Sequence, residues 1–194
     1  MILMRFLILT IGLLASFSNF AQDKTEIEKS IRHKDVPPKA IADLMAILGP
    51  DHKVKWYYQE DGQKKVYEAK FIWFSDHYSV EFNAKDAVIS NVEIELKLNE
   101  LEPKFIKRLH KTLDEIFVDN SIRKIQKEYY GKPEELLELI STQVIPKELS
   151  VQYEVEVIGN NGSKKALFEL ILNKKLKPIS QRQIKVKSSD IFDY

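Results

Sequence analysis

The sequence contains an internal repeat, and this repeat restricts the possible architecture more than any other feature. The pattern Pro38-Lys39-x-Ile41-x-x-Leu44-x-x-x-Leu48 returns as Pro103-Lys104-x-Ile106-x-x-Leu109-x-x-x-Leu113. A second pattern, Phe82-Asn83-x-Lys85-x-x-x-Ile89-Ser90, returns as Leu172-Asn173-x-Lys175-x-x-x-Ile179-Ser180. The same order of patterns at two places predicts one supersecondary unit that the chain uses twice.

Apolar spacing predicts that each unit is a helix followed by four strands. In the first unit, helical spacing begins behind Pro37-Pro38 and stops at Gly49-Pro50, and period-two alternation on both sides of Asp61-Gly62 predicts a hairpin. The second unit begins at Pro103 and carries an additional helix after Pro133. We therefore predict an α+β fold of tandem α-β4 repeats, with helices packed on one face of an antiparallel sheet and the other face open.

The repeat also predicts how the chain is divided. Residues 1–21 are expected to be a signal peptide, 22–36 a flexible or partly helical lead-in, and 188–194 a tail. Between them lie the first unit at 37–98 and the second unit at 99–187, with the inserted helix near 133–145.

The N-terminal residues indicate export. Arg5 precedes a mostly apolar run from Phe6 to Ala15, which is typical of a secretory signal peptide and shorter than the roughly 20 residues that span a bilayer. We expect cleavage after Ala21, a periplasmic or secreted mature chain, and no integral membrane segment after cleavage. Loss of Arg5 would leave 29 Lys and Arg against 29 Asp and Glu. That balance does not favour nucleic acid or anionic lipid as a partner.

Searches for catalytic and metal-binding motifs yield no catalytic residue, metal site or cofactor. The chain has no cysteine, so thiol chemistry and disulfides are excluded, and no Gly-x-Ser-x-Gly motif occurs. The four histidines are scattered. Asp76-His77 near Glu93 or Glu95 is one candidate for a surface metal site, and Glu93 with Glu95 forms a candidate carboxylate pair roughly 7 Å apart. Solvated charges on the outer sheet face are the preferred interpretation of both, and the protein is expected not to be an enzyme.

Strand alternation separates the helix-facing side chains from an outward set. Tyr67, Ala69 and Phe71 are predicted to face the helix. Aromatic and apolar side chains among charges are typical of protein interfaces, so we predict a partner-binding surface on the outer face. Its members are Tyr57, Glu68, Lys70, Ile72, Glu81 and Glu93.

Several short motifs carry a resemblance to a known family. Val36-Pro37-Pro38, Lys53-Val54-Lys55-Trp56, Val66-Tyr67-Glu68-Ala69-Lys70-Phe71 and Tyr78-Ser79-Val80-Glu81-Phe82-Asn83 follow in order, and Tyr153-Glu154-Val155-Glu156-Val157 looks like a second copy of the hairpin strand. This arrangement resembles the PepSY-like exported proteins of Bacteroidetes, whose fold is like that of β-lactamase inhibitor protein. The Asp76-His77 turn lacks the usual glycine, the helix after Pro133 is extra, and the chain continues past the last strand.

The resemblance implies an exported domain pair that binds or inhibits other proteins, and it supplies no catalytic residue. Our leading hypothesis is a non-enzymatic module that binds an exported or envelope protein, such as an envelope or secreted hydrolase that it inhibits. The alternative hypothesis is a periplasmic carrier of a small ligand or metal, with the ligand between the sheet and the helix after Pro133.

Overall fold

The fold is described by a computed structural model that covers residues 22–24, 26–162 and 164–184. The predicted signal peptide (1–21) and tail (188–194) lie outside the described residues. None of the helices in the described ranges has the length and apolar character needed to cross a membrane.

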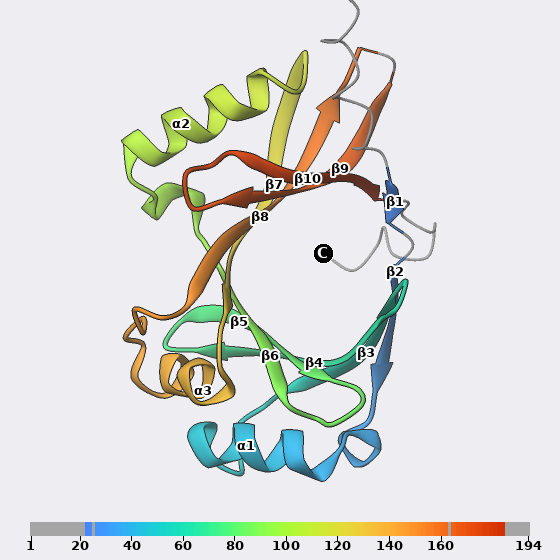
Figure 1. Cartoon of the computed structure of the whole chain (residues 1–194), viewed down its shortest axis with the longest axis vertical. Coiled ribbons are helices and arrows are strands. Elements are labelled where there is room, and N and C mark those ends of the chain that lie inside the picture. Colours follow the sequence, from blue (N-terminus) through green and yellow to red (C-terminus); the bar gives the residue numbers. More distant parts are fainter. Residues whose placement is uncertain (1–21, 25, 163, 185–194) are drawn as a thin grey trace, which may run out of the picture.

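One sheet of ten strands forms the body of the molecule (Figure 1). Each strand from β2 to β10 lies beside the next one in the chain, and these pairs are antiparallel. β1 adds to the far side of β10 in parallel orientation. The strands are β1 (Gln22–Lys24), β2 (Glu26–Ile31), β3 (Lys55–Asp61), β4 (Lys64–Trp73), β5 (Asp76–Asn83), β6 (Ile89–Glu95), β7 (Asp119–Tyr130), β8 (Ser150–Asn160), β9 (Lys165–Asn173) and β10 (Pro178–Ile184).

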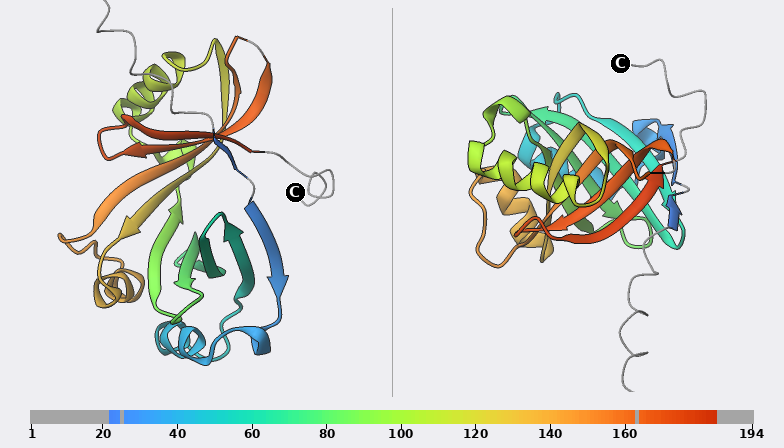
Figure 2. Two further views of the ribbon diagram at one scale, coloured as in Figure 1. Left: turned by 45° about the vertical axis from the view of Figure 1, so that its right-hand side comes forward. Right: turned by 90° about the horizontal axis from the view of Figure 1, so that it is seen from above.

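Three α-helices lie outside the curve of this sheet (Figures 1 and 2). They are α1 (Pro38–Leu48), α2 (Pro103–Asp114) and α3 (Pro133–Thr142), and short 3-10 turns occur at His33–Asp35 and Leu98–Glu100. Each α-helix begins with a proline in its first turn, where the missing N–H removes no helical hydrogen bond.

The apolar core lies between the convex face of the sheet and the helices. Around α2, Leu109 and Leu113 pack with Val155, Phe168 and Leu170. A second cluster joins α1 and α3 over β3 to β6, and its buried members include Leu44, Trp56, Ala69, Phe71, Val80, Phe82, Leu136, Leu139 and Ile140. The sequence alternation predicted that Ala69 and Phe71 of β4 face the helices, and both residues lie in this core.

The prediction of tandem α-β4 repeats is wrong, although the elements follow one another in the predicted order. β6 pairs directly with β7, so the sheet has no boundary between the two halves. The helix α3 and the neighbouring Tyr129 and Leu149, all from the second half of the chain, are buried in the core of the first half. Tertiary packing thus crosses the repeat boundary, and the molecule is an α+β protein built on one continuous sheet.

The prediction that the second face of the sheet is open is also wrong. The sheet curls until its two ends approach each other, and Arg182 of β10 lies 2.5 Å from Asp61 of β3. The segment expected as a flexible or partly helical lead-in forms β1 and β2, which extend the two opposite edges of the sheet (Figure 1). The inner face is therefore concave, and most of its polar side chains are buried or half-buried.

Candidate binding cavity

The concave face of the curled sheet encloses a cavity of about 380 Å³. Small-molecule sites in proteins typically measure about 300 to 1,000 Å³. Ionisable and amide side chains make most of its wall, and only two aliphatic residues contribute. The lining residues are Glu28, Gln59, Asp61, Lys64, Val66, Glu68, Lys70, Glu81, Glu93, Lys124, Gln126, Glu128, Tyr130, Gln152, Glu154, Glu156, Ile171 and Arg182.

Strand alternation explains why these side chains share one face. On β7, Ile125 and Tyr129 pack into the cores, whereas Gln126 and Glu128 line the cavity. The same period runs along β8, where Val155 is buried in the core around α2. Polar residues that alternate with core residues on adjacent strands therefore meet inside the curve.

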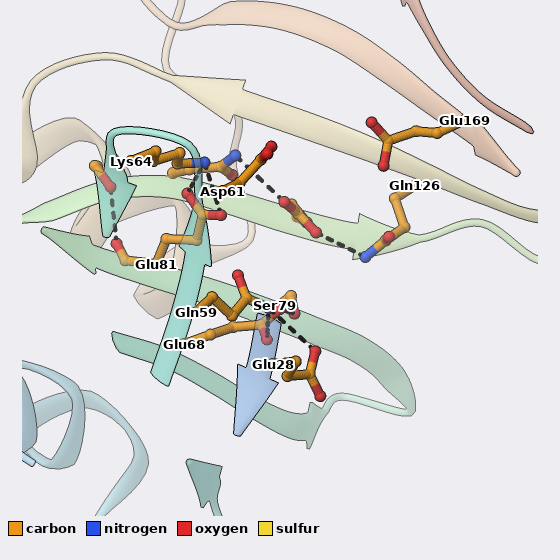
Figure 3. A network of polar contacts seen from close by, with 12 residues as sticks. Glu28, Gln59, Asp61, Lys64, Glu68, Ser79, Glu81, Gln126 and Glu169 are labelled. Atoms are coloured by element: carbon orange, nitrogen blue, oxygen red, sulfur yellow. Dashed lines mark hydrogen bonds and ion pairs between the residues drawn. The ribbon is translucent and has the colours of Figure 1, made fainter. Parts of the chain in front are cut away.

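Glu68 accepts the largest set of contacts in the half of the cavity formed by β2 to β5 (Figure 3). Gln59 and Ser79 donate hydrogen bonds to its carboxylate, and the Lys70 Nζ lies 3.0 Å from it. Lys70 also lies 2.9 Å from the carboxylate of Glu28. Burial raises the pKa of Glu68, and the attraction of Lys70 offsets part of that rise. The contacts of Glu68 join β3, β4 and β5, and the pair of Lys70 with Glu28 adds β2.

A second ion pair joins Lys64 of β4 to Glu81 of β5 (Figure 3). The Nζ of Lys64 lies 2.7 Å from a carboxylate oxygen of Glu81, which is buried. Burial opposes the lysine charge, but the attraction of Glu81 outweighs it and raises the pKa of Lys64. Lys64 is therefore a fixed positive charge at this wall.

A row of charged side chains crosses the other half of the cavity. Register pairs Lys124 with Glu156, Glu156 with Glu169, and Glu169 with Arg182. The Lys124 ammonium lies 3.6 Å from Glu156, and Arg182 lies 2.6 Å from Glu169. Arg182 also contacts Asp61 on β3, so this row continues across the gap between the two ends of the sheet.

Glu93 and Glu128 occupy the floor where the two halves of the sheet join. They are register partners on β6 and β7, and both are buried. Glu93 accepts hydrogen bonds from the amides of Asn91 and Gln126, the latter at 2.9 Å. Glu128 interacts with Tyr130, and its Oε2 has no hydrogen-bond partner. This buried oxygen is the one carboxylate atom of the pair that is without any partner.

The surroundings of these two carboxylates favour the protonated form. Burial raises the pKa of Glu128 to about 7, and the nearby charge of Glu81 adds to the rise. Burial also raises the pKa of Glu93 well above its ordinary value of 4.5, with a further contribution from Glu154. Both carboxyls are therefore easier to protonate than an exposed glutamate.

The residues predicted as an outer binding surface lie mostly inside the molecule. Tyr57 is half-buried, and the Lys70 ammonium lies 4.7 Å from the centroid of its ring. Ile72 is 55% exposed and lies outside the cavity, near the end of β4. The prediction of a water-exposed face is wrong for Glu68, Glu81 and Glu93, which are buried because the sheet curls over them, whereas Lys70 is half-buried. Four of the six line the cavity: Glu68, Lys70, Glu81 and Glu93.

The sequence reasoning missed Glu128, Lys124, Arg182 and Asp61. Polar residues alternate with apolar or aromatic ones along most of Lys124 to Tyr130, which could have placed Glu128 on the polar face. No signal in the sequence links Arg182 with Asp61, because 121 positions separate them.

The other sites weighed from the sequence are not assembled in the described ranges. No three His, Cys, Asp or Glu side chains there lie close enough to hold a metal ion. Asp76 instead accepts a 3.3 Å hydrogen bond from Lys97. The space between the sheet and α3, considered for a ligand, is filled by Leu136, Leu139 and Ile140.

Comparisons with known proteins identify the fold but not the activity. No family model and no curated protein matches the chain, so the PepSY-like assignment is not confirmed. A DUF2874 family protein from Bacteroides uniformis ATCC 8492 is similar in structure with a TM-score of 0.49, 14% identity, and coverage of 76% of this chain and 89% of its own.

A candidate periplasmic protein from Bacteroides eggerthii DSM 20697 is similar with a TM-score of 0.50 and 14% identity, covering 76% of this chain and 88% of its own. At this identity the likeness indicates a shared fold. The description of this neighbour agrees with the periplasmic or secreted location predicted from the leader.

Proposed function

We propose that the protein is an exported, non-enzymatic binding protein and that a small polar ligand binds in the cavity of the curled sheet. The observation that carries the proposal is the buried Oε2 of Glu128, which has no hydrogen-bond partner and belongs to a residue that lines a charged cavity of about 380 Å³. Buried polar atoms in native proteins are almost always hydrogen-bonded, and the exceptions need an explanation. A bound ligand explains this one.

The composition of the cavity wall supports a ligand rather than a purely structural role. A polar interior needs near-complete pairing of its groups, because an unmade hydrogen bond in a low-dielectric interior costs about 1 to 3 kcal/mol. Apolar residues of similar size would hold the strands together as well or better. A hollow interior lined by charged side chains therefore fits a binding role better than a purely structural one.

Export and the absence of catalysis belong to the same proposal. Export is supported by the apolar run from Phe6 to Ala15 and by the description of the Bacteroides eggerthii neighbour. A non-enzymatic role is supported by the lack of cysteine and of a Gly-x-Ser-x-Gly motif.

A test of the ligand is native mass spectrometry of the mature chain purified from its own host without refolding. We expect a native mass that exceeds the denatured mass by a defined increment. Ile171→Trp should abolish the increment because Ile171 lines the cavity, whereas Ile179→Trp, at an exposed position on β10, should keep it. Equal native and denatured masses would count against the proposal.

A second candidate function is the capture of an exported or envelope protein, such as a hydrolase that the chain inhibits. It is favoured by the β4–β5 hairpin end, where Ile72 is 55% and Phe74 is 62% exposed, and by the PepSY-like motifs. Trp73 anchors this hairpin by donating a 3.0 Å hydrogen bond to the carbonyl of Ile140 on α3. Pull-down of a defined partner from envelope extract, lost in Ile72→Ser/Phe74→Ser, is the expected result if this function holds.

A further inference from the structure

The charges in the cavity are unequally matched. Its wall holds eight carboxylates and four basic side chains. Each basic group already has a carboxylate within ion-pair distance: Lys64 with Glu81, Lys70 with Glu28 and Glu68, Lys124 with Glu156, and Arg182 with Asp61 and Glu169. The cavity therefore has more negative groups than its own cations can neutralise.

The described residues provide no ion pair to Glu93 or to Glu128, two of the carboxylates that line the cavity. Glu93 has amide donors, and Glu128 has Tyr130. Residues directly opposite each other on antiparallel strands have Cβ atoms about 4.5 to 5.5 Å apart, and like charges at such positions repel. Two adjacent, buried, ionised carboxylates therefore need either a proton or a cation between them.

We propose that the cavity binds a small organic ammonium ligand whose charged nitrogen lies between Glu93 and Glu128 and donates to the free Oε2 of Glu128. This inference rests on the proposed ligand-binding function. An ammonium group supplies several N–H donors and one positive charge, which matches an unpartnered acceptor beside a second carboxylate. A metal ion fits less well, because no three potential ligands among the described residues lie close enough together.

In the empty cavity a proton takes the place of the ligand. Because burial raises the pKa of Glu128 to about 7, its carboxyl is largely protonated at pH 6. The ammonium ligand enters with its charge, and the carboxyl proton leaves to solvent. The titratable groups that influence Glu128 are Glu81, Lys64, Glu169 and Tyr130, with Glu93 as its register partner. Glu154 and Glu68 also influence Glu93.

The test is calorimetric titration of the mature protein with 1,4-diaminobutane at pH 6 and pH 8, in two buffers of different ionisation enthalpy. We expect binding of one ligand per chain and affinity about tenfold higher at pH 8, because a group with a pKa near 7 must first release its proton at pH 6. The two buffers should report proton release on binding at pH 6. Butane-1,4-diol, which has the same length and no charge, should not bind.

Variants locate the ligand. Glu128→Gln should weaken binding at least tenfold and remove the dependence on pH, and Glu93→Gln should weaken binding independently if the first variant folds poorly. Glu95→Gln, the same substitution at an exposed position on β6, should bind as the wild type does. Undiminished binding in both the Glu128 and Glu93 variants would overturn the site.

The remaining outcomes separate this inference from the function on which it rests. Tight binding of Ca²⁺ or Mg²⁺ with none of the diamine would overturn the ammonium ligand and leave a ligand-binding cavity. A retained, uncharged ligand in the native mass spectrum, with no diamine binding, would do the same. Equal native and denatured masses together with no diamine binding would remove both.

Discussion

Replacing Glu128 with glutamine should stabilise the folded protein relative to the wild type as the pH rises from 5 to 8. The Glu128 side chain is 3% exposed, and burial raises its pKa from 4.5 to about 7. The folded chain therefore holds this proton more tightly than the unfolded chain. The resulting stability is fully present below pH 4.5 and is lost as the pH rises through 7.

The size of the effect follows from that pKa. A rise from 4.5 to about 7 corresponds to about 3 kcal/mol in the free energy of unfolding, of which about 2.5 kcal/mol falls between pH 5 and pH 8. Glutamine resembles the protonated carboxyl and does not titrate. The difference in stability between Glu128→Gln and wild type should therefore shift by about 2 to 3 kcal/mol in favour of the variant over this interval.

Urea unfolding at pH 5, 6, 7 and 8 with linear extrapolation measures this difference directly. Any change in the contact with Tyr130 adds a constant offset and cancels when the two pH values are compared. Glu95→Gln, exposed on the neighbouring strand, should show no such shift. A difference that does not vary with pH, or that favours the wild type as pH rises, would refute protonation of Glu128 in the folded state.

Three further substitutions test the closure and the core. Arg182→Met should destabilise the chain by about 3 kcal/mol in urea unfolding, because it removes the cation next to Glu169, which is 1% exposed. The double variant Arg182→Met/Glu169→Gln should recover much of that loss. A double variant no more stable than the single one would contradict this reasoning. Gly159→Ala should cost about 1 to 3 kcal/mol, because the new Cβ would lie 2.4 Å from the ring of Phe117, and an unchanged melting temperature would show that the ring moves freely. Leu139→Ala should cost about 2 to 5 kcal/mol if α3 is part of the first core, and a cost below 1 kcal/mol would place the helix outside that core.

The sequence by itself was sufficient for the local elements and for the polarity of each strand face. The helices begin at Pro38, Pro103 and Pro133, because proline is compatible with the first turn and its neighbours have helical apolar spacing. Alternation along β4 separated Ala69 and Phe71 from Glu68 and Lys70, as the structure shows. These features depend on residues within about ten positions of one another.

Only the tertiary structure decided what the polar face does. Whether that face meets water or encloses a cavity depends on the curvature of all ten strands and on the pairing of β1 and β2 with opposite edges of the sheet. The contact of Arg182 with Asp61 and the juxtaposition of Glu93 with Glu128 both depend on that closure and register. Period-two alternation states on which side of a strand a residue lies, but curvature and register are sums of many long-range contacts, so the site could not be derived from neighbouring residues alone.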